Sequence, residues 1–205
     1  IVSSKGGGAS IGWLESPENP RDVAAWKYHR LRDAGWIMSL EKIDMDGDGD
    51  LDVIASDRKG ASRGVLWLEN PGLDANRKGE TWKDHSIGAK GREVMFLDVA
   101  TSKDGILEEV LVATKPVEFR RIARGEGFTP WVETTETLPA KVLGTAKSVR
   151  NADIDLDGTA DFVFSCEQAS GAKTGLVWLK GRTFGDPMWT LKQLAGPKGV
   201  KYDLL

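Results

Sequence analysis

The chain has 205 residues, enough to bury a substantial core in one large all-β domain or two small ones. Its 28 basic and 31 acidic side chains give a net charge of −3, so no excess of positive charge favours nucleic acid or an anionic membrane surface. No apolar stretch approaches the roughly 18 residues of a membrane span. The single cysteine, Cys166, excludes an internal disulfide and is expected to be buried in an apolar strand.

Three sequence landmarks recur with one period. The first is a tryptophan in an apolar run, with 54 residues from Trp13 to Trp67 and 111 from Trp67 to Trp178, and residues 117–122 fill the place between. The second is a further tryptophan in each unit, at Trp26, Trp82, Trp131 and Trp189. The third is an aspartate that ends an alternating apolar run, at Asp44, Asp98 and Asp153. A period of about 55 residues suits a four-stranded β-propeller blade.

Within each period, short segments rich in Val, Ile, Trp and Phe alternate with Gly, Asn, Pro or Asp, which is the pattern of strands and turns. Residues 23–31 have a helix-like pattern, but they coincide with a repeated strand position, so we expect a strand. The best-preserved unit predicts strands near residues 37–43, 52–56, 64–69 and 82–87. The predicted units span residues 1–31, 36–87, 92–137 and 146–194, and residues 199–205 begin another.

The sequence therefore predicts one all-β domain, residues 1–205, with about 3.75 four-stranded propeller blades. The first unit starts inside its second strand, and the last stops inside its first. This favours a fragment of a propeller of about six to eight blades. A closed four-bladed ring is the alternative, because closure removes exposed sheet edges.

Two aspartate-rich loops, residues 44–52 and 153–161, fit the pattern D-x-D-x-D-G-x-x-D. Carboxylates this close repel each other by on the order of 0.5 to 1 kcal/mol per neighbouring pair, even in a water-like dielectric. Ca²⁺ reverses that repulsion, because it accepts six to eight oxygens from such a wrapped loop. The seventh position would lend its backbone carbonyl. The predicted ligands of two calcium ions are Asp44, Asp46, Asp48, Asp50 and Asp52 in the first loop and Asp153, Asp155, Asp157, Thr159 and Asp161 in the second.

An EF-hand, a pair of simple turns and a magnesium site each fit these loops less well. An EF-hand needs a glutamate at position twelve and flanking helices, but that position holds Ala55 or Phe164 and both flanks resemble strands. Simple hairpin turns do not explain two matched loops in a periodic array, and Mg²⁺ prefers water-rich octahedral sites. The corresponding segment of the third unit, residues 98–109, has lost most carboxylates and carries Lys103. We therefore expect no ion there, and a structural role for calcium elsewhere.

The repeats and loops resemble the FG-GAP/VCBS repeat proteins, whose blades carry such calcium loops between their first two strands, as in the α-subunit propellers of integrins. The resemblance extends over nearly all 205 residues as repeats. Its specific motif is confined to the two loops and the strands that follow them. It implies an extracellular, periplasmic or cell-surface module that is used for adhesion or carbohydrate recognition.

Several other residues have simple interpretations. His29 and His85 share one repeat position that holds Thr134 or Lys192 in other units, so we expect a tolerant strand position and no zinc site. Trp36 has no aromatic counterpart in the repeats and is a minor candidate for a ligand contact. The charged residues Glu118, Arg120 and Arg121 indicate an eroded blade more than an anion site.

We expect a non-enzymatic calcium-binding propeller module that serves as an extracellular interaction or adhesion scaffold, with no catalytic residues. Its partner would be an unidentified protein or carbohydrate on the propeller face, with no nucleic acid and no membrane span. The alternative is the propeller portion of a carbohydrate-active enzyme, a sugar lyase or dehydratase, whose active site is not identifiable in this sequence. A third class has calcium loops and no ligand.

Overall fold

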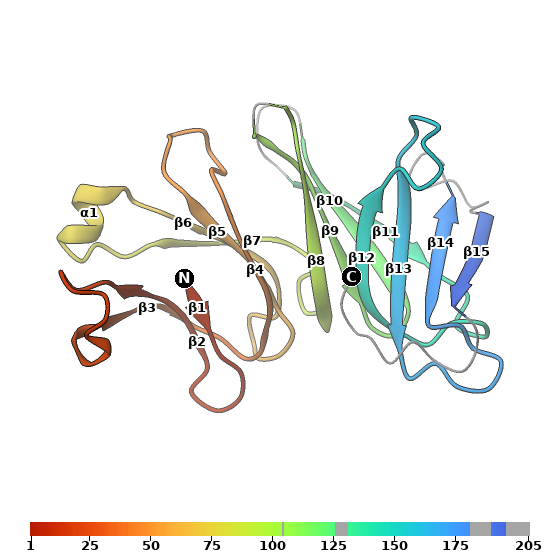
Figure 1. Cartoon of the computed structure of the whole chain (residues 1–205), viewed down its shortest axis with the longest axis horizontal. Helices are drawn as coiled ribbons and strands as arrows, with labels where there is room; N and C mark the ends of the chain where they lie inside the picture. Colours follow the sequence, from red (N-terminus) through yellow and green to blue (C-terminus); the bar gives the residue numbers. More distant parts are fainter. Residues whose placement is uncertain (104, 126–130, 181–189, 196–205) are drawn as a thin grey trace.

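The computed structural model describes residues 1–103, 105–125, 131–180 and 190–195 (Figure 1). In these residues the regular structure is almost all strand, interrupted by a 3₁₀ turn at Val23–Ala25 and a short helix, α1, at Leu73–Arg77. The strands form antiparallel sheets in which consecutive strands are hydrogen-bonded neighbours. The prediction of an all-β chain is confirmed.

The described residues form four sheets in chain order, and propeller blades have this meander topology. The first sheet contains β1 (Val2–Ser3), β2 (Ser10–Glu15) and β3 (Lys27–Asp33). The second contains β4 (Ile37–Ile43), β5 (Asp52–Asp57), β6 (Gly64–Glu69) and β7 (Lys83–Gly88). The third contains β8 (Val94–Thr101), β9 (Leu107–Thr114), β10 (Glu118–Arg124) and β11 (Trp131–Thr137). The fourth contains β12 (Thr145–Ala152), β13 (Asp161–Glu167), β14 (Leu176–Lys180) and β15 (Thr190–Ala195).

The strands predicted for the second unit agree closely with β4 to β7. The helix-like stretch 23–31 is mainly extended, because only Val23–Ala25 form a helical turn before β3 begins at Lys27. Pairing of β3 with β2 gives its backbone groups partners, and this tertiary context overrides local helix propensity. The further strand predicted at residues 199–205 lies outside the described residues.

The core consists of apolar clusters that join each sheet to the next. Ile11 of the first sheet packs with Val53 of the second. In the cluster between the second and third sheets, Ile54 packs with Ile122, and Phe119 of the third sheet lies against Phe162 of the fourth. Strands β4, β8 and β12 are neighbours, so the sheets form a row whose first strands lie side by side (Figure 1). This face-to-face packing of successive sheets is propeller-like.

The placement of Asp98 differs from the prediction. Strand β8 continues to Thr101, so Asp98 lies inside the strand opposite Leu111 and does not begin a loop. The repeats have unequal lengths, with 57 residues from Ile37 to Val94 but 52 from Val94 to Ala146, measured between equivalent positions of β4, β8 and β12. The two differences nearly cancel over two units, which makes Asp98 appear to be in phase.

Candidate metal centres

The two aspartate-rich loops join the first and second strands of the second and fourth sheets, and both lie at the same end of the molecule (top of Figure 1). The first aspartate of each loop shapes the turn by accepting backbone N–H groups. Asp44 accepts from Gly47 (2.7 Å) and Gly49 (3.0 Å). Asp153 accepts from Asp157 (3.1 Å) and Gly158 (2.9 Å). The loops therefore share one local fold, which follows from their shared motif.

In the first loop, three predicted ligands converge. One carboxylate oxygen from each of Asp44, Asp46 and Asp48 lies within 4.8 Å of the others. The backbone N–H of Asp48 donates to Asp46 (3.3 Å), and that of Asp50 donates to Asp48 (2.8 Å). These bonds turn the side chains toward their own loop and produce a compact acidic cluster at the surface.

Asp52, the last predicted ligand of the first loop, has another position. It is buried and accepts backbone N–H bonds from Met45 (2.9 Å) and Asn70 (2.7 Å). Burial raises the pKa of Asp52, although these N–H groups act in the opposite direction. Asp52 therefore fastens the loop to β5 and to the chain after β6, and neither it nor the Asp50 carboxylate belongs to the converging group.

The second loop brings together a slightly different set, Asp153, Asp155 and Asp161, again within 4.8 Å. Asp161 is fully buried and accepts the N–H of Ile154 (3.1 Å), much as Asp52 does in the first loop. Asp157 lies outside the group. It accepts the N–H of Thr159 (2.8 Å), which is the main reason that its pKa lies below the ordinary value. Thr159 occupies the position whose backbone carbonyl was predicted as a ligand.

Protein cations also approach both loops. The Lys180 ammonium, on β14, forms an ion pair with Asp155 and lies 3.5 Å from Asp157, and the bond to Asp155 raises the pKa of Lys180. Near the first loop, burial lowers the pKa of Arg124 on β10, whereas Asp46 and Asp44 raise it. Sequence reasoning missed both cations. Alignment of the repeats contains a signal for Lys180, because it replaces Glu69 two residues after the conserved tryptophan.

The donor sets fit a hard divalent cation. Each loop offers three converging carboxylates and backbone carbonyls, all oxygen ligands of the kind that Ca²⁺ prefers. Each loop leads into a strand, β5 or β13, so neither is an EF-hand. The arrangement can neutralise mutual repulsion among the aspartates and fix the path of the loop.

In the third sheet, a protein side chain provides the positive charge. Glu109, at the position of Asp52 in β5, is buried and forms an ion pair with Arg121. The neighbouring Arg120 is buried and pairs with Glu133 and with Glu118 (3.0 Å). The two arginines that interrupt the repeat pattern therefore bind carboxylates of their own sheet, which supports the eroded-blade interpretation.

The two histidines also have structural contacts. His29 stacks on Trp13 with ring centroids 4.1 Å apart, and its Nε2 lies 2.7 Å from Glu15. His85 repeats this on Trp67, at 4.3 Å, with Glu69. Each pair is a cross-strand contact between the third and fourth strands of a sheet, as expected for a strand position.

Cys166 is 1% exposed, and burial raises the pKa of its thiol to about 12, so it is packed as an apolar residue and is not a reactive thiolate. In the described part of the chain, no helix has the length and apolar character needed to cross a bilayer. Comparison of the sequence with protein-family models and with curated proteins gives no match.

Proposed function

We propose that this chain is a calcium-stabilised β-propeller segment that acts as a non-enzymatic interaction scaffold outside the cytoplasm. The observation that carries the proposal is the pair of acidic clusters at equivalent loops of the second and fourth sheets. Three exposed or partly exposed carboxylates that converge in this way are unfavourable without a cation, and their oxygens match the preference of Ca²⁺. The ion would hold the turn between the first two strands of its blade.

We further propose that the sheets belong to a ring of about six to eight blades. Successive sheets pack face to face, and the first and fourth lie at opposite ends of the row (Figure 1). That open row supports a segment of a larger ring over a closed ring of four blades. A propeller of this kind offers loops at both ends of each blade for binding a protein or carbohydrate.

Calorimetric titration of the chelator-treated protein with Ca²⁺ tests the proposal, and two bound ions are expected. Asp46→Asn and Asp155→Asn alter equivalent positions of the two loops and should each remove one ion. At a free calcium concentration of 100 times Kd, each site should add about 2.7 kcal/mol to the free energy of unfolding. Asp74→Asn removes an exposed acid of α1 and is the matched control.

The same titration with Mg²⁺ tests the identity of the ion. Weak or no heat is expected, because the loops provide many carboxylate oxygens and Mg²⁺ prefers to retain water. A protein that takes up no Ca²⁺, and whose melting temperature is unchanged by chelator, would exclude the proposed role of calcium.

A further inference from the structure

At the end of the chain opposite the acidic loops, three cationic side chains surround one indole ring. The Nζ atoms of Lys5 and Lys59 lie 4.8 Å and 4.9 Å from the centroid of Trp36, and the guanidinium carbon of Arg58 lies at 5.2 Å. Lys5 comes from the β1–β2 turn and the other two cations from the β5–β6 turn. Two consecutive sheets thus contribute positive charge to one aromatic residue.

The repeats show what these cations contact elsewhere. Lys5, Arg58 and Lys115 occupy the same position, directly after the second strand of the first three sheets. Arg58 reaches the residue before β8 in the next sheet, Glu93, at 2.5 Å, and Lys115 lies 3.8 Å from the same carboxylate. Lys5 reaches the equivalent residue before β4, which is Trp36. In that place the carboxylate is replaced by an indole.

The local charge is consequently unbalanced. Arg58 is bound to Glu93, and the buried Asp57 carboxylate accepts the N–H groups of Gly35 (3.0 Å) and Trp36 (2.8 Å). In the described residues, neither Lys5 nor Lys59 forms an ion pair, and both are exposed. Two ammonium groups are thus held at an aromatic face without a carboxylate of their own.

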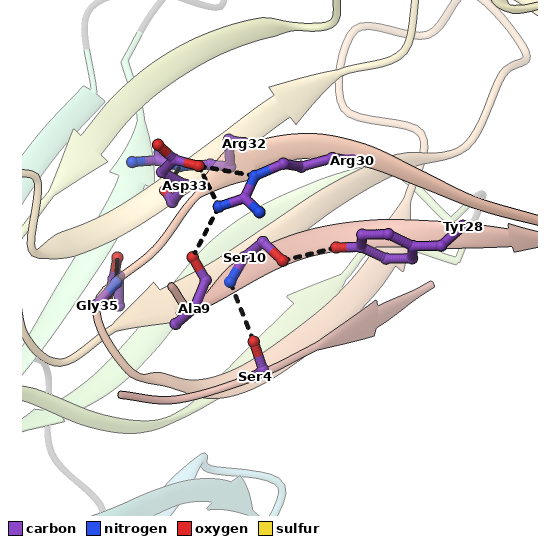
Figure 2. A network of polar contacts seen from close by, with 9 residues as sticks. Ser4, Ala9, Ser10, Tyr28, Arg30, Arg32, Asp33 and Gly35 are labelled. Atoms are coloured by element: carbon purple, nitrogen blue, oxygen red, sulfur yellow. Dashed lines mark hydrogen bonds and ion pairs between the residues drawn. The ribbon is translucent and has the colours of Figure 1, made fainter. Parts of the chain in front are cut away.

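The turn that carries Lys5 is held in place (Figure 2). Ser4 accepts the N–H of Ser10 (3.1 Å), and the Ser10 hydroxyl lies 2.7 Å from that of Tyr28. Arg30 donates to the carbonyl of Ala9 (3.4 Å) and to Asp33 (2.7 Å). These bonds fix both ends of the turn, so the lysine projects from an ordered base.

The second turn is fixed against the same segment. Gly6 donates to the carbonyl of Gly35 (3.1 Å), and Arg58 donates its N–H to the carbonyl of Trp36 (2.8 Å). A Cβ built on Gly35 would lie 2.0 Å from the carbonyl oxygen of Lys59, so only glycine permits this close approach. The three cations are therefore positioned before any ligand arrives, which reduces the entropic cost of binding.

A hollow of about 210 Å³ adjoins this cluster and has Arg32, Gly35, Asp57 and Ser62 in its walls. Gly35 and Asp57 directly precede Trp36 and Arg58 in the chain, so the hollow begins beside the indole. Its volume lies below the roughly 300–1,000 Å³ of drug-sized pockets. It suits a ligand of about one sugar residue.

We propose that Trp36, Lys5, Arg58 and Lys59 bind a carboxylate or sulfate group of a small ligand or of one unit of a chain. The oxyanion would take the place that Glu93 fills in the next sheet, reducing repulsion among the cations and accepting charge-assisted hydrogen bonds. This inference rests on the scaffold part of the proposed function and is independent of calcium.

Titration with galacturonate, inorganic sulfate and neutral glucose, at low ionic strength, tests the site. Both anions should bind and glucose should not. The double variant Lys5→Ala/Lys59→Ala should weaken anion binding at least tenfold. Lys173→Ala, in the β13–β14 turn at the same end of the molecule, is the control and should leave it unchanged.

Trp36→Glu provides the sharpest test, because it restores the carboxylate present at Glu93. The variant should fold with an unchanged or higher melting temperature and should lose anion binding, since its own side chain occupies the cations. Undiminished anion binding by this variant and by the lysine double variant, binding of glucose equal to that of galacturonate, or no binding of either anion by the unaltered protein would overturn the inference.

Calcium titration of the same variants separates the two proposals. The Trp36 and lysine variants should still take up two calcium ions, because the acidic loops lie at the other end of the sheets. Loss of anion binding with calcium uptake intact identifies the cationic site. Anion binding by a protein that takes up no calcium would exclude the calcium proposal alone.

Discussion

At the scale of single residues, the two acidic loops build the same turn from different side chains. Gly47 has a φ of +82°, and Leu156, its equivalent in the second loop, has a φ of +59°. Left-handed backbone costs a residue with a Cβ roughly 1–2 kcal/mol. Leu156 is 86% exposed, so the leucine gains no burial in return.

Leu156→Gly should therefore raise the free energy of unfolding by about 0.5–1 kcal/mol, because relief of backbone strain exceeds the extra entropy of glycine in the unfolded chain. Gly47→Ala is the matched reverse change. No atom lies within 4 Å of its added Cβ, so a loss of similar size would be purely conformational. Urea unfolding in chelator measures both, and a less stable Leu156→Gly protein would contradict the prediction.

The ammonium of Lys180 has a separate consequence. It occupies the vicinity of Asp155 and Asp157, where an ion bound to the second loop would also lie. Removing it in Lys180→Met should increase the calcium affinity of that loop by about two- to fivefold, the range expected for a partly exposed charge interaction. Lys173→Met is the control. Calorimetry that shows equal or weaker binding by Lys180→Met would disprove competition between the two cations.

At the scale of strands and sheets, stability depends on side chains that are shared by neighbouring sheets. Phe119 of β10 is fully buried, with ring centroids 5.3 Å from Phe162 and 6.0 Å from Phe164 in the next sheet. Phe119→Ala should lower the free energy of unfolding by about 3–5 kcal/mol, because it leaves a cavity between two sheets.

Val132→Ala is the control for this substitution, since Val132 lies on β11 of the same sheet and is 53% exposed. It should change the free energy of unfolding by less than about 0.5 kcal/mol. Denaturant unfolding measures both. A small effect of Phe119→Ala would mean that the sheets are stable without one another, contrary to the shared cores.

The strands were predictable because alternating apolar residues and turn residues act locally, as in β4 and β6. The loop of the third sheet was misplaced, because Asp98 preserved the average period although the individual repeats differ in length. The positions of Lys180 and Arg124 depend on how side chains cross between strands and sheets, and that information is absent from the spacing of aspartates.

At the scale of the whole molecule, the open row of sheets predicts an extended shape. A compact chain of 205 residues has a radius of gyration of about 17 Å. Small-angle scattering of the monomer should give a larger value, because the first and fourth sheets lie at opposite ends of the row. Sedimentation at the same concentration verifies that the particle is monomeric. A value at or below 17 Å would instead support a closed four-bladed ring.

The ion pair between Glu109 and Arg121 makes the sheets differ in their dependence on their surroundings. A cation that belongs to the chain cannot be diluted away or captured by a chelator. On the calcium proposal, the sheets on either side hold a cation that can leave. A fall in ambient calcium would then loosen the chain at two separate places around a centre that stays ordered, so its response would come in parts.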